Sequence, residues 1–84
     1  MTTEQIEKYI ETEKRKNAAV FIHFKDRQPV EGVFIVGKDY DELKSKNLWR
    51  IVTETKYEQW KEKKDINLSR IFNGISFTRL STES

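Results

Sequence analysis

The sequence contains no cysteine and a single histidine, His23. Without cysteine the chain can form no disulfide bond and carry no thiol chemistry, and metal sites built on thiolates are excluded as well. One histidine also excludes a metal site with two histidine ligands in one chain. His23 lies among alternating strand-type residues, where a lone histidine is more often packed or exposed than catalytic. We therefore predict a protein that is not an enzyme and that holds no cofactor or metal.

Glycine is scarce, and the three glycines are scattered, so no glycine-rich loop can cradle a phosphate group. The acidic residues Asp39, Asp41 and Glu42 lack the spacing and the glycine of a calcium-binding loop, which favours a solvated turn. Long apolar runs are missing too. Residues 1–17 have no apolar segment of the secretory kind, and no run approaches the roughly 20 apolar residues that span a membrane. We expect a cytoplasmic protein with no membrane partner.

The composition indicates one domain over residues 1–84. Charged residues make up 36% and aromatic residues 12%, which fits a compact core beneath a charged surface rather than disorder. A domain this small buries a modest fraction of its surface, so association with further copies is a natural source of burial. Sixteen basic residues are nearly balanced by fourteen acidic ones. A preference for a charged partner therefore depends on where these charges lie.

Residues 3–17 read as a helix. The segment begins with the spacing of a capping box, and Ile6, Tyr9 and Ile10 recur at helical spacing. Acidic residues come first and the basic run 14–16 comes last, an order that suits the helix dipole. The apolar stripe must pack on something, and we expect this helix to cover one open end of a barrel.

Two strands joined by a turn follow the helix. Residues 20–25 are rich in branched and aromatic side chains with a period of two, which is typical of a strand. The turn contains Asp26, which can bond back to the backbone, and Pro29, which cannot donate to a ladder. The second run, 30–36, contains Gly32, and a lone glycine inside a strand usually marks a bend or bulge. A strand bent there can turn the corner of a small barrel.

The middle of the chain is less regular. Residues 38–47 are polar and read as a turn or a single helical turn, whereas residues 48–55 alternate as a strand. The charged segment 56–65 extends a hairpin or holds a few helical residues.

The last part of the chain reads as two strands, 66–72 and 75–80, with a short tail at 81–84. Asn73-Gly74 between the strands is the typical dipeptide of a two-residue hairpin turn, because both residues accept a positive φ.

One helix and five strands predict a mainly β fold: an N-terminal helix followed by a five-stranded, strongly bent, SH3-like or Sm-like barrel over residues 20–80. An OB-fold would need a helix between its third and fourth strands, which only residues 56–65 could supply. A plain SH3-type barrel with an added helix is the other alternative.

Two short motifs narrow the choice. The first comprises Phe24-Lys25-Asp26, Val30-Glu31-Gly32, Phe34 and Asp39. The second is the segment 71–80, in which Gly74 is followed three and six residues later by the apolar residues Phe77 and Leu80. In residue type and order these motifs resemble the two motifs of the Sm-like family, which includes Sm, LSm and Hfq proteins. The resemblance covers most of the chain.

The resemblance implies a ring of copies that binds single-stranded RNA through loop residues. In Sm-like proteins, bases stack on a side chain in the loop after the second strand, and the match here is Tyr40. Each stacked base is worth about 1–3 kcal/mol. Lys38 and Arg70 would attract the phosphates. The RNA-binding candidates are Lys38, Asp39, Tyr40, Arg70, Asn73 and Gly74.

Self-association has a physical basis of its own. The strands 66–72 and 75–80 would be the edges of an incompletely closed sheet, and pairing the edge of one copy with the next removes unpaired backbone groups. This predicts a homo-oligomer.

The alternative is a protein-interaction or structural barrel without RNA binding. Its contact candidates are Trp60 and Tyr57, which lie in a dense run of mixed charge. A tryptophan in such a segment either folds back over the barrel or forms a contact surface.

Overall fold

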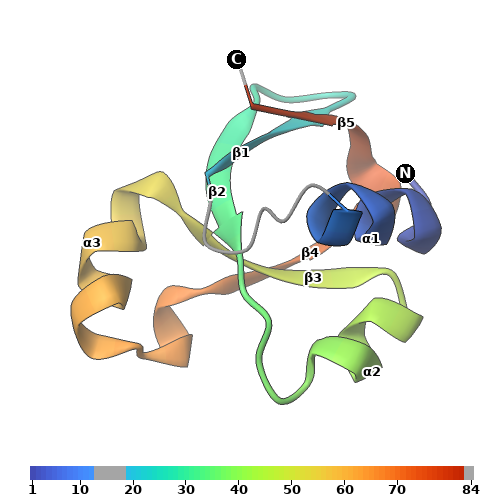
Figure 1. The fold of residues 1–84 in the computed structure, drawn as a ribbon. Helices are drawn as coiled ribbons and strands as arrows, with labels where there is room; N and C mark the ends of the chain where they lie inside the picture. The colour runs from blue at the N-terminus through green and yellow to red at the C-terminus, as the bar shows by residue number, and fades with distance from the viewer. Residues whose placement is uncertain (13–18, 83–84) are drawn as a thin grey trace.

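The computed structural model describes residues 1–12 and 19–82 (Figure 1). It combines one five-stranded antiparallel sheet with three α-helices and two short 3-10 helices. The elements, in chain order, are α1 (Thr3–Thr12), β1 (Val20–Phe24), β2 (Val30–Phe34), α2 (Tyr40–Ser45), β3 (Leu48–Thr53), α3 (Glu54–Lys63), η1 (Ile66–Leu68), β4 (Arg70–Asn73), η2 (Gly74–Ser76) and β5 (Phe77–Ser81).

The strands lie in the order β4-β3-β2-β1-β5, and every neighbouring pair is antiparallel. Within the described residues no ladder joins β4 to β5, so the sheet is not closed and has these two strands as its edges. The five strands and the N-terminal helix are as predicted. With α2 and α3 added, the fold is a small α/β domain rather than a mainly β one.

Gly32 lies at the centre of the sheet, opposite Val20 on one side and Thr53 on the other. A Cβ atom at this position would lie 2.6 Å from Cγ2 of Ile51 and 3.0 Å from the carbonyl oxygen of Val52. A side chain here would therefore push β2 off β3. The sequence predicted a bend or bulge at Gly32. No register shift interrupts either ladder there, and this close approach is what requires a glycine.

Alternate strand residues point to the face of the sheet that α1 covers. In Figure 1, α1 lies between β5 and β3 on the side toward which the sheet curves. Ile6 and Ile10 of α1 are fully buried there, and burial of each such side chain contributes about 1.5–3 kcal/mol. The core cluster comprises Ile6, Ile10, Val20, Ile22, Phe34, Trp49, Ile51, Phe77 and Leu80. The N-terminal helix acts as the predicted cover, while its basic run 14–16 lies outside the described residues.

The segment predicted as a hairpin extension is helical. Its residues form α3, from Glu54 to Lys63, because Glu, Lys and Gln are strong helix formers and the segment has no strand-like alternation. The helical reading, which the sequence also allowed, holds for residues 56–63. The helix begins two residues earlier, inside the run 48–55 predicted as a strand, and residues 64–65 lie outside it. Residues 40–45 likewise form a short helix, α2, as predicted for 38–47.

The prediction for the last two strands is wrong in its pairing. Arg70–Asn73 and Phe77–Ser81 do not form a hairpin but lie at opposite edges of the sheet. Gly74–Ser76 between them forms η2, with Asn73 as its N-cap at φ −89°. The Asn73 side chain accepts a hydrogen bond of 2.9 Å from the amide of Ile75. This hydrogen bond between the Asn73 side chain and the nearby backbone stabilises a 3-10 turn here instead of a hairpin turn.

Within residues 1–12 and 19–82, no helix has the length and apolar character that crossing a lipid bilayer requires.

Candidate functional site

Arg50 of β3 holds together two segments that contain predicted RNA-binding residues. Its guanidinium donates 2.6 Å to Oδ2 of Asp39, which precedes α2, and 3.1 Å to Oγ of Ser69, which precedes β4. The Arg50 side chain is only 14% exposed, and its Nε is buried without a hydrogen-bond partner. The hydrogen bond from Arg50 lowers the pKa of Asp39 below its ordinary value, although partial burial of the carboxyl acts in the opposite direction.

Lys38 and Arg70 flank the residues that Arg50 binds. Each directly adjoins one of the two residues that Arg50 binds, and both side chains are exposed. The Arg70 guanidinium carbon lies 5.7 Å from the ring centroid of Phe72. We call Arg50, its partner Asp39 and the adjoining cations Lys38 and Arg70 the Arg50 cluster. Arg70 pairs with Ile51 in the ladder, so its side chain lies on the opposite face of the sheet from Arg50.

Arg50 was not among the predicted site residues. The sequence does contain a feature that could have identified it: Arg50 is the one charged residue in the otherwise apolar run 48–52, LWRIV. A lone arginine on a mostly buried strand needs a partner.

Tyr40 is engaged within the molecule. It is the first residue of α2, and its ring packs against Trp49 with centroids 6.0 Å apart and planes at 68°. Its hydroxyl donates 3.1 Å to Glu11, and the ammonium of Lys44 lies 5.1 Å from its ring centroid. Burial, and then the hydrogen bond with Glu11, raise the pKa of Tyr40. Because Trp49 and Arg50 point to opposite faces of β3, Tyr40 and the ion pair of Arg50 with Asp39 lie on opposite faces too.

Gly74, which follows Asn73 at the end of β4, connects β4 to the N-terminus and to Asn47 through backbone hydrogen bonds. The amide of Gly74 donates 2.8 Å to the carbonyl of Asn47, and its own carbonyl accepts 2.9 Å from the amino group of Met1. Asn47 in turn accepts 2.8 Å from the indole of Trp49. Gly74 is buried while Asn73 remains exposed, so only Asn73 presents a side chain to a ligand at this end of β4.

Tyr57 and Trp60, the protein-contact candidates, form one aromatic pair on α3. Their rings are nearly parallel at 19°, with centroids 6.4 Å apart. Lys64 places its ammonium 4.0 Å from the Trp60 centroid, and Lys61 lies 5.7 Å from that of Tyr57. This basic aromatic surface is separate from the Arg50 cluster in sequence and element.

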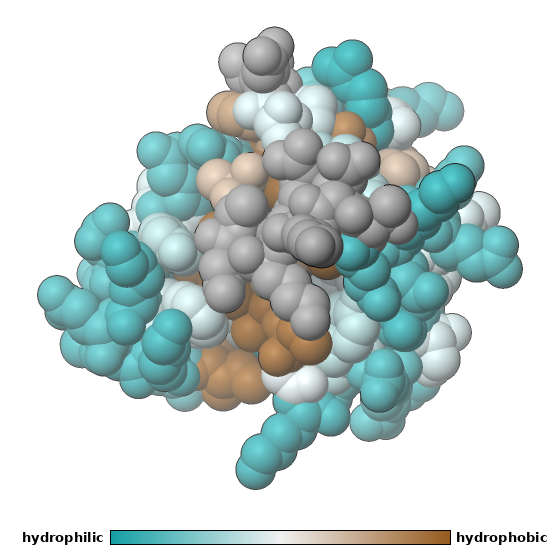
Figure 2. All heavy atoms as spheres, viewed as in Figure 1, coloured by the Kyte–Doolittle hydropathy of each residue, from teal (hydrophilic) through white to brown (hydrophobic). Residues whose placement is uncertain are grey.

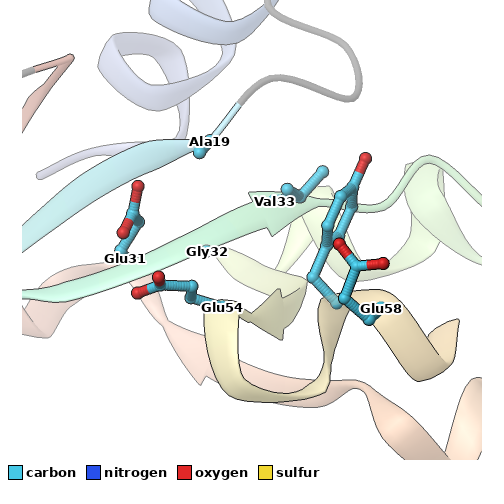
Figure 3. Close-up of a pocket in the computed structure, with 7 residues that line it drawn as sticks. Ala19, Glu31, Gly32, Val33, Glu54 and Glu58 are labelled. Atoms are coloured by element: carbon cyan, nitrogen blue, oxygen red, sulfur yellow. The ribbon is translucent and has the colours of Figure 1, made fainter. Parts of the chain in front are cut away.

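A hollow of about 230 Å³ lies between β2 and α3, shown in Figure 3. We call it the α3 hollow. Its lining residues are Ala19, Glu31, Gly32, Val33, Glu54, Tyr57 and Glu58. A hydrogen bond with the Glu54 carboxyl raises the pKa of Glu31, and desolvation and the repulsion between the two carboxylates act in the same direction. The sequence did not reveal this hollow, because its glutamates come from segments more than twenty positions apart.

His23 is held on the surface of the sheet by its neighbours on β5. Its Nε2 lies 3.0 Å from Oγ of Ser81 and 3.3 Å from the Arg79 guanidinium. Among the described residues, no group of three or more His, Asp or Glu side chains is placed so that it could hold a metal ion.

Comparison with family models, with curated proteins and with solved structures gives no match to this chain.

Proposed function

We propose that this chain is a non-enzymatic, Sm-like module that associates with copies of itself through its edge strands and binds single-stranded RNA. The observation that carries the proposal is the open sheet, whose two edges are β4 and β5. An N-terminal helix on a five-stranded, bent antiparallel sheet is the arrangement that the resemblance to Sm-like proteins implies.

Apolar side chains accompany the open edges. Ile71 of β4 is 49% exposed, and Ile75, just before β5, is 75% exposed. Figure 2 shows hydrophobic side chains at the surface between α3 and α2. An edge strand with exposed apolar residues is a ready template for another strand. Pairing β4 of one copy with β5 of the next is a head-to-tail contact, which closes into a ring when the rotation between copies permits.

The backbone of Ile71 points away from the sheet. Arg50, its partner on β3, accepts a hydrogen bond of 2.9 Å from the amide of Ile35 and so turns its own backbone groups toward β2. In an antiparallel ladder Ile71 must then direct its amide and carbonyl outward. Proline at this position would remove an outward donor and leave the β3–β4 bonds intact.

Ile71→Pro is therefore expected to reduce an oligomer to monomers, whereas Ile71→Ala, which keeps the amide, retains assembly. Light scattering on both variants at matched concentrations measures the difference, and circular dichroism verifies that each is folded. A wild-type chain that is monomeric at every accessible concentration would remove self-association from the proposal.

RNA binding is proposed at the Arg50 cluster, because its exposed cations Lys38 and Arg70 each adjoin a residue that Arg50 binds. Tyr40 is a poorer platform for a base than the sequence predicted, since its ring already packs against Trp49 and Lys44. Fluorescence anisotropy of labelled A-rich and U-rich RNA at two salt concentrations tests this site. The double variant Lys38→Ala/Arg70→Ala is expected to lower the slope of log affinity against log salt by about 1–2.

A matched control removes two lysines of α3 instead, as Lys56→Ala/Lys63→Ala. Equal losses in both double variants would show that the attraction is general and that the Arg50 cluster is not the RNA site. No binding of either RNA at low salt would remove RNA from the proposal.

A second candidate function is protein contact through Tyr57 and Trp60. The observation that favours it is that α3 has no buried residue, so its stacked rings remain at the surface. Under this function Trp60→Ala abolishes association with a protein partner and leaves both self-assembly and RNA binding unchanged.

A further inference from the structure

The α3 hollow has a lining whose charged groups are all acidic. Glu31 comes from β2, whereas Glu54 and Glu58 come from α3, and Figure 3 shows Glu54 extending toward Glu31. Gly32 and Val33, both buried, form the apolar part of the wall. The chain as a whole carries more basic than acidic residues. The lining of the hollow therefore differs in charge from the chain as a whole, because its three charged residues are all glutamates.

In the part of the chain that the structure describes, the carboxylates of Glu31, Glu54 and Glu58 form no salt bridge. Two of the nearby lysines, Lys61 of α3 and its C-cap Lys64, lie over the rings of Tyr57 and Trp60. The neighbouring carboxyl of Glu54 instead raises the pKa of Glu31, and an incoming cation would relieve the repulsion between the two acids.

The rest of the lining narrows the class of cation. Tyr57 contributes an aromatic ring, and aromatic rings attract ammonium and guanidinium groups. Val33 offers apolar surface to an alkyl stem. A hydrated metal ion uses neither feature, because it binds to oxygen ligands alone. A mixed wall of carboxylate, aromatic and aliphatic groups suits an organic cation.

We propose that the α3 hollow binds an organic cation, an alkylammonium or guanidinium group whose stem lies against Val33 and Tyr57 and whose charge faces the three glutamates. The group comes either from a lysine or arginine side chain of a protein or from a free polyamine. This site is independent of the RNA-binding and assembly proposals, because it shares no residue with the Arg50 cluster or with the sheet edges.

An NMR titration of the isotopically labelled full chain tests the proposal. The probes are n-butylammonium, spermidine and Nα-acetyl-lysine amide, each at constant ionic strength, with Mg²⁺ for comparison. Saturable shifts centred on Gly32, Val33 and Tyr57 are expected with the organic cations. Tighter binding of spermidine would identify a polyamine source, and tighter binding of the lysine amide would identify a protein side chain.

Two charge-matched variants decide whether the site is specific. Glu54→Gln/Glu58→Gln is expected to weaken binding about tenfold. Glu4→Gln/Glu62→Gln removes the same charge from outside the hollow and is expected to leave affinity unchanged. Equal weakening in both variants, absence of saturable shifts, or Mg²⁺ producing the same shifts at the same concentration would each overturn the proposal.

Discussion

Gly74 lies where no side chain fits. A methyl group there would overlap the side chain of Asn47 and approach Cδ1 of Ile6 to 2.6 Å. Asn47 cannot easily move, because it donates 3.0 Å to the carbonyl of Met1 and accepts a bond from Trp49. Gly74→Ala is expected to lower the free energy of unfolding by about 1–3 kcal/mol, the usual range for overpacking. Urea denaturation measures the change.

Gly37 supplies the control for this prediction. The nearest atom to a methyl group at Gly37 would be Oδ1 of Asp39, at an ordinary distance of 3.7 Å. Gly37→Ala is expected to change stability by less than about 1 kcal/mol and to favour folding, since alanine reduces the freedom of the unfolded chain. A similar loss in both variants would mean that crowding at Gly74 is not the cause.

The ion pair of Asp39 and Arg50 makes stability depend on pH in a definite direction. The pKa of Asp39 is lower in the folded chain than its ordinary value of 3.8, so the folded state favours the charged carboxylate. The pair therefore stabilises the fold above pH 3.8, and this contribution disappears as the pH falls through the lower, folded-state pKa. Asp39→Asn is expected to reduce the melting temperature at pH 7, with the deficit shrinking below pH 3.8.

Asp41→Asn is a suitable comparison for this ion pair. Its side chain is 93% exposed, and its contact with Lys44 is 3.7 Å long. Exposed pairs of this kind contribute little, so its melting temperature should follow the wild type across the same range. A pH profile for Asp39→Asn that runs parallel to the wild type would contradict the role of the pair.

At the scale of elements, α3 ends on a strained residue. Lys64 adopts φ 52° and ψ 30°, the left-handed conformation, and its amide donates 2.7 Å to the carbonyl of Trp60. A residue other than glycine pays roughly 1–2 kcal/mol there. The contact of its ammonium with the Trp60 ring stabilises the fold by only about 0.5–1 kcal/mol at an exposed site. Lys64→Gly is therefore expected to raise the free energy of unfolding by about 0.5 kcal/mol.

Lys61→Gly gives the opposite result by the same reasoning. It also removes an ammonium from above an aromatic ring, but Lys61 lies inside the helix, where glycine lowers stability by about 1 kcal/mol. Chemical denaturation of the two variants should show changes of opposite sign. Destabilisation by both would indicate that the cation–ring contact outweighs the backbone strain.

The sequence predicted the elements whose side chains show a clear period and missed the contacts between elements. The strands β1 to β3 and the start of α1 follow from alternation and helical spacing. The hairpin predicted at Asn73-Gly74 is wrong, because an asparagine that suits a hairpin turn can also cap a 3-10 turn, as Asn73 does. Asp39 and Tyr40 are neighbours in sequence, yet one contacts Arg50 and the other Trp49. Alternation along β3 places Arg50 and Trp49 on opposite faces, but no local pattern encodes that Asp39 contacts the first and Tyr40 the second.

At the scale of the whole molecule, the fold divides into a protected centre and two open edges. The strands β1, β2 and β3 are each hydrogen-bonded on both sides, whereas β4 and β5 have one neighbour apiece. Most of the core cluster lies on the three central strands and on α1. The two edge strands differ, because β5 contributes Phe77 and Leu80 to the core cluster whereas β4 contributes no residue to it.

Two neighbouring amides of β4, those of Ile71 and Phe72, should respond differently to association in a hydrogen-exchange measurement. Phe72 directs its backbone toward Trp49 of β3, while Ile71 directs its backbone outward. In a monomer the Ile71 amide is bonded to water and exchanges its hydrogen quickly, whereas that of Phe72 is protected by the ladder. Pairing between copies would protect Ile71 as well. We expect protection of Ile71 to rise with protein concentration in hydrogen-exchange NMR while that of Phe72 stays constant. If Ile71 remains unprotected in a sample that light scattering shows to be oligomeric, the copies associate through another surface, and the face of α3 that carries the half-buried Trp60 becomes the one to test.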